Sequence, residues 1–223
     1  MSTSVKICGI RTLPALEAAI AAGASYYGMV FYPPSPRNIS LATAARLAAR
    51  ARGRIESVAL VVDAGDALIE AIIAAADPDM IQLHGNETPE RVKAIRKLVG
   101  RPVIKAVKVA KAGDAEAAKG YKRTADLIVF DAKPSPKRKG ALPGGNGLSF
   151  DWRILRGAGT KTRFMLSGGL TPENVAEAIR VTGAAIVDVS SGVETAPGKK
   201  QAALIRRFMA AVKTPALEEV NHG

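Results

Sequence analysis

The sequence predicts a single-domain α/β protein folded as a closed (β/α)8, or TIM, barrel. Short β-branched apolar runs alternate with Ala- and Leu-rich helical stretches eight times along the 223 residues, which implies a parallel sheet with crossover helices. The runs are almost wholly apolar, as strands buried on both faces are. A doubly wound sheet is the main alternative, but the segment ICGIRTL after the first run lacks the G-x-G-x-x-G fingerprint expected there.

Strands and helices are predicted from the change between apolar runs and helical patterns. The predicted strands cover residues 5–8, 26–31, 57–62, 80–83, 103–107, 127–130, 163–166 and 185–189. The predicted helices cover residues 13–22, 41–52, 66–76, 89–99, 112–120, 151–157, 172–182 and 199–212.

Capping signals support several of these helices. The segment TPE at 88–90 and again at 171–173 places a capping hydroxyl, then proline at the first helical position, then an acid in the first turn. Gly23, Gly100 and Gly183 stand where helices are expected to end.

The chain is predicted to be one soluble, cytoplasmic domain. No linker divides residues 1–223, the expected core runs from about 5 to 212, and residues 213–223 are expected to form a frayed tail. The single cysteine cannot form an internal disulfide, which fits a reducing compartment. The start MSTSVK has no signal-peptide apolar region. No apolar run reaches the ~18–20 residues that span a bilayer, so we expect no membrane contact.

The formal net charge of +12 has two interpretations. Lysine and arginine can neutralise nucleic-acid phosphates, or they can steer a small anionic substrate. Aromatic residues make up only 4% of the chain, which provides few platforms for stacking bases, and no nucleic-acid-binding motif is present. We therefore expect no nucleic-acid binding and interpret the densest basic run, KPSPKRK at 133–139, as a solvated loop.

In a barrel of this kind the functional groups lie at the carboxyl ends of the strands. The predicted strand ends bring a set of polar and glycine residues to that face: Cys8, Arg37, Gln82, His84, Asp131, Gly168, Gly169, Asp188, Ser190, Ser191 and Gly192.

Cys8 ends the first predicted strand, so its thiol is expected at the mouth of the barrel. It could be a nucleophile, a general base or a small buried apolar residue. A thiol with a pKa of about 8.5 is only slightly ionised at neutral pH, and a nearby cation or a pocket dipole would raise the ionised fraction. One cysteine and two histidines do not suffice for a tetrahedral metal site without carboxylates, and we expect no metal.

Asp131 follows the apolar run LIVF at the end of the sixth strand. It could be a cap or a salt-bridge partner, or a proton donor kept protonated by partial burial. A base on the first strand and an acid on the sixth would stand on opposite sides of the mouth. Removing a proton on one side and donating one on the other is the chemistry of an isomerase.

The compositions of two predicted loops are suited to binding an anion. LSGGLTPENV at 166–175 and VDVSSGVE at 187–194 place glycines and serines after the seventh and eighth strands, where this fold usually binds phosphate through backbone N–H groups. Ordinary tight turns are the alternative.

Arg37, in the proline-stiffened segment PPSPRN, suits recognition of a carboxylate or phosphate, or it is a surface arginine. His84 could tune Cys8, contact a substrate or only complete the wall.

Seven segments occur in order and at fitting spacings: KICGI, GMVFYPPSPR, QLHG, VFDA, GGNG with FDW, LSGGLTPENV, and VDVSSGVE with GKK. With them the chain closely resembles the phosphoribosylanthranilate isomerase family of tryptophan biosynthesis, from about residue 5 to 212. Two segments depart from the family pattern. Asn146 stands in GGNG where a small hydroxyl residue is usual, and Ser25 stands in GAS where GAD is common.

The resemblance implies an Amadori rearrangement of N-(5-phospho-β-D-ribosyl)anthranilate to 1-(2-carboxyphenylamino)-1-deoxy-D-ribulose 5-phosphate. It implies Cys8 as general base, Asp131 as general acid, Arg37 at the substrate carboxylate, and the two glycine loops at the phosphate, with Gly145 also contacting substrate. No metal or organic cofactor is implied, because the anthranilate nitrogen serves as the electron sink. Monomers and dimers both occur on this architecture, so a homodimer stays open.

Two rival functions stay open at this point. One is another phosphosugar isomerase on the same barrel, such as the histidine-pathway ketol isomerase, which handles two phosphates and uses two carboxylates. The first strand here offers a thiol instead. The other is a nucleic-acid-binding protein, which would be retained on DNA with a steep dependence on salt.

Overall fold

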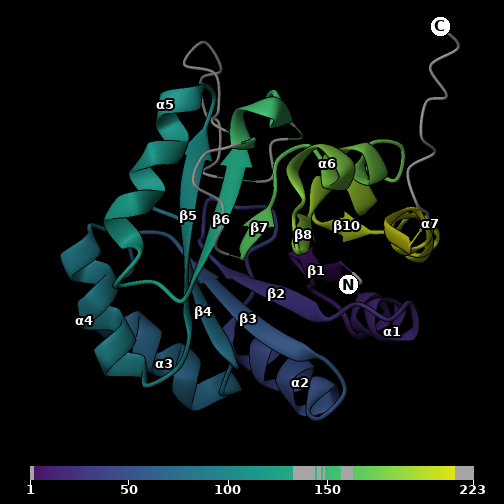
Figure 1. The fold of residues 1–223 in the computed structure, drawn as a ribbon. Helices are drawn as coiled ribbons and strands as arrows, with labels where there is room; N and C mark the ends of the chain where they lie inside the picture. Colours follow the sequence, from purple (N-terminus) through teal and green to yellow (C-terminus); the bar gives the residue numbers. More distant parts are fainter. Residues whose placement is uncertain (1–2, 133–143, 145–146, 148, 157–162, 214–223) are drawn as a thin grey trace, which may run out of the picture.

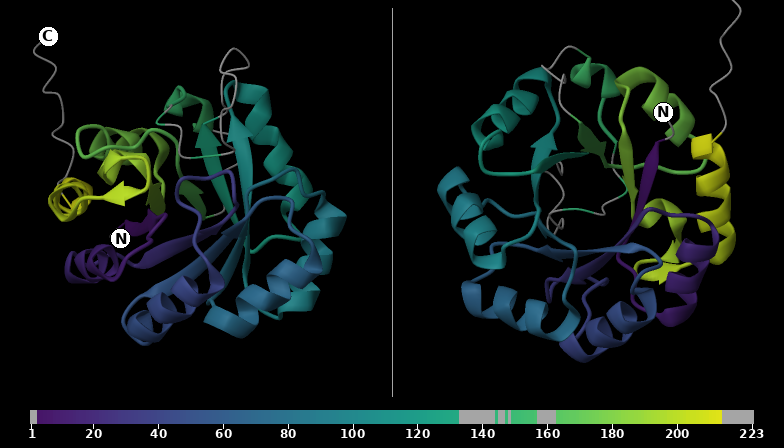
Figure 2. Two further views of the ribbon diagram at one scale, coloured as in Figure 1. Left: turned by 180° about the vertical axis from the view of Figure 1, so that it is seen from behind. Right: turned by 60° about the horizontal axis from the view of Figure 1, so that its bottom comes forward.

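Eight parallel strands close a barrel in this protein. The structure is a computed structural model that describes residues 3–132, 144, 147, 149–156 and 163–213. Within them the strands follow one another in chain order, and the last pairs with the first (Figure 1). The helices form an outer ring around the strands, as the right-hand view of Figure 2 shows. The predicted fold class is confirmed.

The elements keep close to the predicted order. The barrel strands are β1 (Ser4–Cys8), β2 (Tyr26–Phe31), β3 (Glu56–Val61), β4 (Met80–Leu83), β5 (Val103–Val109), β6 (Leu127–Ala132), β7 (Phe164–Leu166) and β8 (Ile186–Val189). The α-helices are α1 (Leu13–Ala21), α2 (Leu41–Ala51), α3 (Asp66–Ala76), α4 (Pro89–Val99), α5 (Ala112–Ala115), α6 (Val175–Thr182) and α7 (Ala202–Lys213). The remaining elements are the 3-10 helices η1 (Glu116–Tyr121), η2 (Trp152–Leu155) and η3 (Ser191–Val193), and the strands β9 (Glu194–Ala196) and β10 (Lys199–Lys200).

Each barrel strand presents alternate residues to two different cores. Outward-facing residues pack against the helices in the larger core, as Val5 and Ile7 of β1 do. Inward-facing residues fill the barrel below its mouth: Val58, Ile104, Ala106, Val129, Met165 and Ile186. Nearer the mouth, Cys8 packs with Val30 and Leu60. The alternation therefore decides which side chains can reach the site.

Three predicted helices are replaced in part by other secondary structure. Residues 112–120 form only one α-helical turn and then η1, in which no residue is fully buried, so burial contributes little to holding a longer α-helix. The segment predicted as a helix at 151–157 is the 3-10 helix η2 as far as it is described. Residues 199–200, predicted to begin the last helix, form β10 and pair antiparallel with β9.

The helix predicted at 172–182 begins three residues later. The side chain of Asn174 accepts a hydrogen bond from the backbone N–H of Thr171 at 2.8 Å and donates one to the carbonyl of Gly169 at 2.9 Å. These side-chain bonds replace the first helical turn, which is the usual competition between Asn and the helix. The predicted cap at Thr88 is confirmed, because its hydroxyl accepts from the N–H of Arg91.

Some expectations concern residues that the structure does not describe. The basic run 133–139, Gly145, Asn146 and the tail 214–223 lie outside the described residues. Among the helices that are described, none is both long and apolar enough to cross a bilayer.

A buried ion pair fixes the loop after β4. Lys105 of β5 donates to the Glu87 carboxylate at 2.8 Å and to the carbonyl of Gly85 at 2.9 Å, and both side chains are almost fully buried. The N–H groups of Asp63 and Gly85 also donate to Glu87. Burial alone would raise the pKa of Glu87. The charge of Lys105, its hydrogen bond and the backbone N–H groups outweigh this effect and hold the pKa below its ordinary value. The stability from this carboxylate is therefore present above pH about 4.3 and is lost as pH falls through the lower folded-state pKa.

Replacing Lys105 by methionine is expected to lower the free energy of unfolding by about 3–5 kcal/mol, because it leaves the Glu87 carboxylate buried without its cation. Denaturant unfolding measures the change. The matched control is Arg153→Met, which removes the cation of the exposed pair with Asp151 and is expected to leave the midpoint unchanged. Equal small effects of both variants would contradict a stabilising role for the buried pair.

Candidate active site

The carboxyl ends of the strands surround one pocket. About 490 Å³ of space lies within and above it, part of which is open to solvent. The pocket is lined by Cys8, Val30, Tyr32, Ser35, Arg37, Leu60, Val62, His84, Asp131, Gly144, Ser167, Asp188 and Ser190. The predicted mouth of the barrel is therefore a cavity, and it gathers residues that lie far apart in the sequence.

Cys8 is the last residue of β1 and faces this pocket with 5% of its surface exposed. Burial raises the pKa of its thiol above the ordinary value, while the positive charges of Lys6 and Lys200 act in the opposite direction. The thiol is thus held in an apolar wall with cations close by.

Asp131 lies on the far wall of the same pocket, within β6 rather than after it, because the strand continues to Ala132. Its carboxylate is 3% exposed, and one oxygen accepts from the N–H of Ala132 at 3.0 Å. A Cβ at Gly144 would lie 3.0 Å from the other oxygen, so the backbone passes close over this carboxylate. Cys8 and Asp131 therefore share one cavity.

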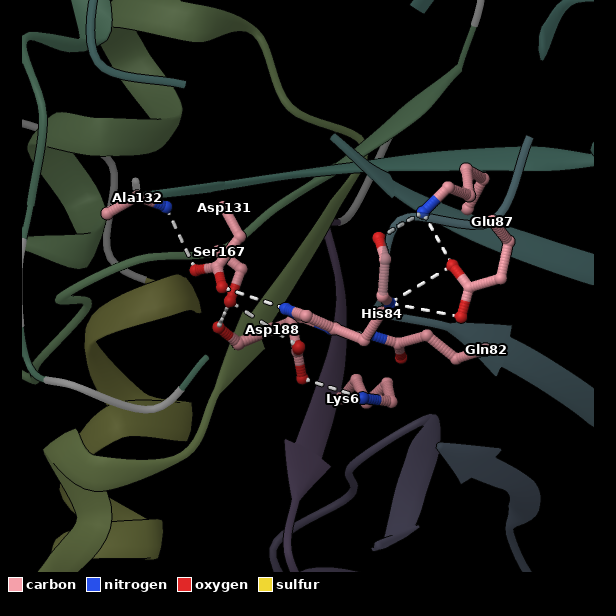
Figure 3. Close-up of polar contacts among 10 residues, drawn as sticks. Lys6, Gln82, His84, Glu87, Asp131, Ala132, Ser167 and Asp188 are labelled. Atoms are coloured by element: carbon pink, nitrogen blue, oxygen red, sulfur yellow. Dashed lines mark hydrogen bonds and ion pairs between the residues drawn. The ribbon is translucent and has the colours of Figure 1, made fainter. Parts of the chain in front are cut away.

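His84 joins Asp131 to Gln82 (Figure 3). The Nε2 atom of His84 lies 3.0 Å from Asp131 Oδ2, and its Nδ1 atom lies 3.0 Å from Gln82 Nε2. Both ring nitrogens are held, so the imidazole has one orientation. His84 lines the pocket, whereas Gln82 is fully buried and reaches the site only through His84.

Arg37 reaches the pocket from the loop after β2, and its guanidinium is held in a two-pronged contact. Its Nε donates to Glu194 Oε1 at 2.9 Å, and an Nη donates to Oε2 at 2.7 Å. Lys200 donates to the same Glu194 at 2.7 Å. Glu194 therefore orients two cations beside the mouth.

A second, smaller pocket adjoins the first and shares Asp131, Ser167, Asp188 and Ser190 with it. Its remaining lining is Ala132, Gly147, Gly168, Gly169, Leu170 and Ser191. This is the place predicted for an anion, between the loops that follow β7 and β8.

Glycine is required at position 168 of this second pocket. The φ angle of Gly168 is +93°, and a Cβ there would lie 2.6 Å from the backbone nitrogen of Ala132. Gly192 is not part of the lining of the second pocket, and its backbone packs closely against the carbonyl of Leu170, where a Cβ would not fit. Gly145 lies outside the described residues.

Sequence reasoning missed several residues of the site, of which Lys6 is the most informative. Lys6 is fully buried and donates to Asp188 Oδ1 at 3.1 Å inside the barrel (Figure 3). Lys6 lies two positions before Cys8, so both side chains face the barrel interior on a strand of period two, and a lysine within an apolar run was the available signal. Ser167, Glu194 and Lys200 fall within the quoted segments LSGGLTPENV, VDVSSGVE and GKK, but their residue types did not single them out, and only the fold brings them to the mouth. Among the described residues, no three His, Cys, Asp or Glu side chains gather to hold a metal ion.

The fold and the site define a (β/α)8-barrel protein with two adjoining pockets at the carboxyl ends of its strands, the second of them lined by glycines and serines. A family model described as N-(5'phosphoribosyl)anthranilate (PRA) isomerase matches residues 5–211. N-(5'-phosphoribosyl)anthranilate isomerase of Parvibaculum lavamentivorans is 50% identical over 213 residues, which cover 96% of this chain and 99% of that protein. The protein of the same name from Rhizobium meliloti is 51% identical, with 96% and 98% covered.

Solved structures agree with these relatives. The crystal structure of phosphoribosyl anthranilate isomerase from Thermotoga maritima matches with a TM-score of 0.83 and 36% identity, covering 95% of this chain and 98% of that one. A complex of phosphoribosyl anthranilate isomerase with reduced 1-(o-carboxyphenylamino)-1-deoxyribulose 5-phosphate matches with a TM-score of 0.82 and 34% identity over the same shares. The chain belongs to the N-(5'-phosphoribosyl)anthranilate isomerase family, as the sequence motifs predicted.

Proposed function

We propose that this protein converts N-(5-phospho-β-D-ribosyl)anthranilate to 1-(2-carboxyphenylamino)-1-deoxy-D-ribulose 5-phosphate, with Cys8 as general base and Asp131 as general acid. Membership of the isomerase family supports the activity. The observation that carries the two roles is that Cys8 and Asp131 line one pocket, which adjoins a pocket lined by glycines and serines.

The reaction moves protons without a net change in oxidation state. Asp131 donates a proton to the ribose ring oxygen, and the ring opens to a Schiff base between C1′ and the anthranilate nitrogen. The Cys8 thiolate then removes the proton from C2′, and the electron pair flows toward the nitrogen to give an enolamine. Tautomerisation returns a proton to C1′ and leaves the ketone at C2′. A base and an acid on opposite walls suit this sequence, because each meets a different atom of the sugar.

The two ends of the substrate are anionic, and the two pockets offer complementary groups. Backbone N–H groups of the loops after β7 and β8 would bind the phosphate. The guanidinium of Arg37 would face the anthranilate carboxylate, and Glu194 fixes its orientation. Ser190 lines both pockets and Ser191 lines the second, so their hydroxyl groups would be available to the phosphate.

Turnover of the anthranilate substrate by the purified protein tests this proposal. We expect conversion of that substrate and none of the histidine-pathway aminoaldose, because the sequence predicts one phosphate site, between the loops after β7 and β8, and the aminoaldose carries two phosphates. Conversion of the histidine-pathway substrate alone would overturn the proposal. Binding to DNA with a steep salt dependence and no turnover would favour a nucleic-acid-binding protein.

Replacing Arg37 by alanine is expected to raise KM by about tenfold or more with a smaller change in kcat, since a hydrogen bond to a charged group is worth about 1.5–3 kcal/mol. Steady-state kinetics measure the two constants separately. The control is Arg46→Ala, which removes an exposed arginine from α2 and is expected to leave KM unchanged. An unchanged KM in the Arg37 variant would mean that other groups hold the carboxylate.

Three further expectations remain proposals. The relatives include a dimeric enzyme from Thermotoga maritima, and for this chain a homodimer is an option that sedimentation would test. A cytoplasmic location and the absence of nucleic-acid binding stay predictions from the sequence.

A further inference from the structure

A buried lysine–aspartate pair lies inside the barrel, with Asp188 in the pocket wall and Lys6 beneath it. The side chain of Lys6 is 0% exposed and that of Asp188 is 4% exposed, and their Nζ and Oδ1 atoms are 3.1 Å apart. Burying two charges costs several kcal/mol, and a pair of apolar residues of similar volume is often as stable. Stability alone therefore does not account for an ion pair at this position.

The ammonium of Lys6 lies next to the sulfur of Cys8. Both residues are on the inner face of β1, one strand repeat apart. Gly28 of β2 pairs with Cys8, and a Cβ built on it would lie 3.0 Å from Cys8 Sγ and 3.2 Å from Lys6 Nζ. The two atoms thus converge over a residue without a side chain, and any larger residue would push them aside. An ammonium has three N–H groups, so the bond to Asp188 leaves others for the sulfur.

We propose that Lys6 supplies the positive charge that stabilises the Cys8 thiolate, and that Asp188 acts as a positioning residue that holds the ammonium of Lys6 beneath the sulfur. This proposal rests on the proposed function, because it takes Cys8 to be the general base. Lys6 acts through Cys8 and transfers no proton to substrate.

The charged groups around Cys8 leave this role to Lys6. Lys200 also faces the thiol, but its three N–H groups have other acceptors, which are Glu194 at 2.7 Å, the carbonyl of Ser190 at 2.9 Å and the Ser190 hydroxyl at 3.3 Å. Arg37 is held by the same Glu194. His84 and Asp131, on β4 and β6, are bonded to each other on the opposite wall.

The directions of the pKa shifts agree with this arrangement. Burial lowers the pKa of Lys6, but Asp188 and Cys8 raise it more, so Lys6 carries its charge at neutral pH. Burial of Cys8 raises the pKa of its thiol, Lys6 lowers it, and the negative charge of Asp188 raises it. Removing Lys6 and removing Asp188 should therefore shift the thiol in opposite directions, which a merely structural role would not do.

The experiment is a pH titration of the thiolate absorbance in the whole protein. Cys8 is the only cysteine, so the titration of Cys8→Ser serves as the blank that removes the tyrosine signal. Lys6→Met is expected to raise the pKa of Cys8 by about 1–3, and Asp188→Asn is expected to lower it. The alkaline shift of Lys6→Met should also move its kcat profile to higher pH, with activity partly recovered there.

Lys6→Met leaves Asp188 buried without its partner and so could fail to fold. In that case a second comparison tests whether Lys6 lowers the pKa of Cys8. The double variant Lys6→Met/Asp188→Asn buries no lone charge, and its Cys8 pKa is expected to exceed that of Asp188→Asn alone. Equal values in these two proteins overturn the inference. The proposed function fails on a different result, which is the absence of turnover by the unmodified protein even though its thiolate titrates as expected.

Discussion

Replacing Cys8 by serine is expected to lower kcat by about 10²- to 10⁴-fold, the usual contribution of a positioned general base. The hydroxyl is a much weaker acid than the thiol, so almost none of it is ionised to accept the C2′ proton. The substrate still contacts the same walls, since serine differs from cysteine by one atom. The loss should therefore fall on kcat far more than on substrate affinity.

Steady-state kinetics with a binding measurement for the product separate these two effects. The thermal unfolding midpoint checks that the buried hydroxyl has not disturbed the barrel. Because burial raises the pKa of Cys8, the kcat of the unmodified protein should rise with pH through that value. Unchanged turnover in Cys8→Ser, or a missing alkaline rise, would remove Cys8 from the role of base.

Replacing Asp131 by asparagine is expected to lower kcat by a similar factor of about 10²- to 10⁴-fold, because the amide cannot protonate the ring oxygen. The amide oxygen can still accept from the N–H of Ala132, so the local structure should persist. Ring opening would then limit the rate, and the closed-ring substrate would accumulate on the protein.

The matched control makes the same chemical change at the other end of β6. Asp126 precedes the strand and accepts from the N–H of Val103 at 2.9 Å, far from the pocket lining. Asp126→Asn is expected to retain full kcat. A fully active Asp131→Asn would exclude Asp131 as the acid, and equal losses in both variants would mean that the defect lies in the strand and not in the proton transfer.

Sequence patterns predicted the bounds of a strand or helix correctly where those bounds depend on the residues of the element itself. The strands β2 and β4 and the helices α3 and α4 have the predicted bounds, because their apolar pattern and caps agree with their burial. The patterns failed where a side chain competes with the backbone, as Asn174 does before α6, and where burial contributes little to holding a helix, as in η1. The β9–β10 hairpin also escaped prediction, because a two-residue strand carries almost no periodicity.

The sequence by itself determined the alternation of strands and helices, the family, and the set of residues at the strand ends, since each depends on short-range pattern or on motif order. The tertiary structure decided which of those residues meet: His84 with Asp131, Arg37 with Glu194, and Lys6 with Asp188 beside Cys8. The partners in these pairs are separated by 47, 157 and 182 positions along the chain. Barrel closure brings them together, and no local propensity encodes a contact that depends on which strand lies next to which.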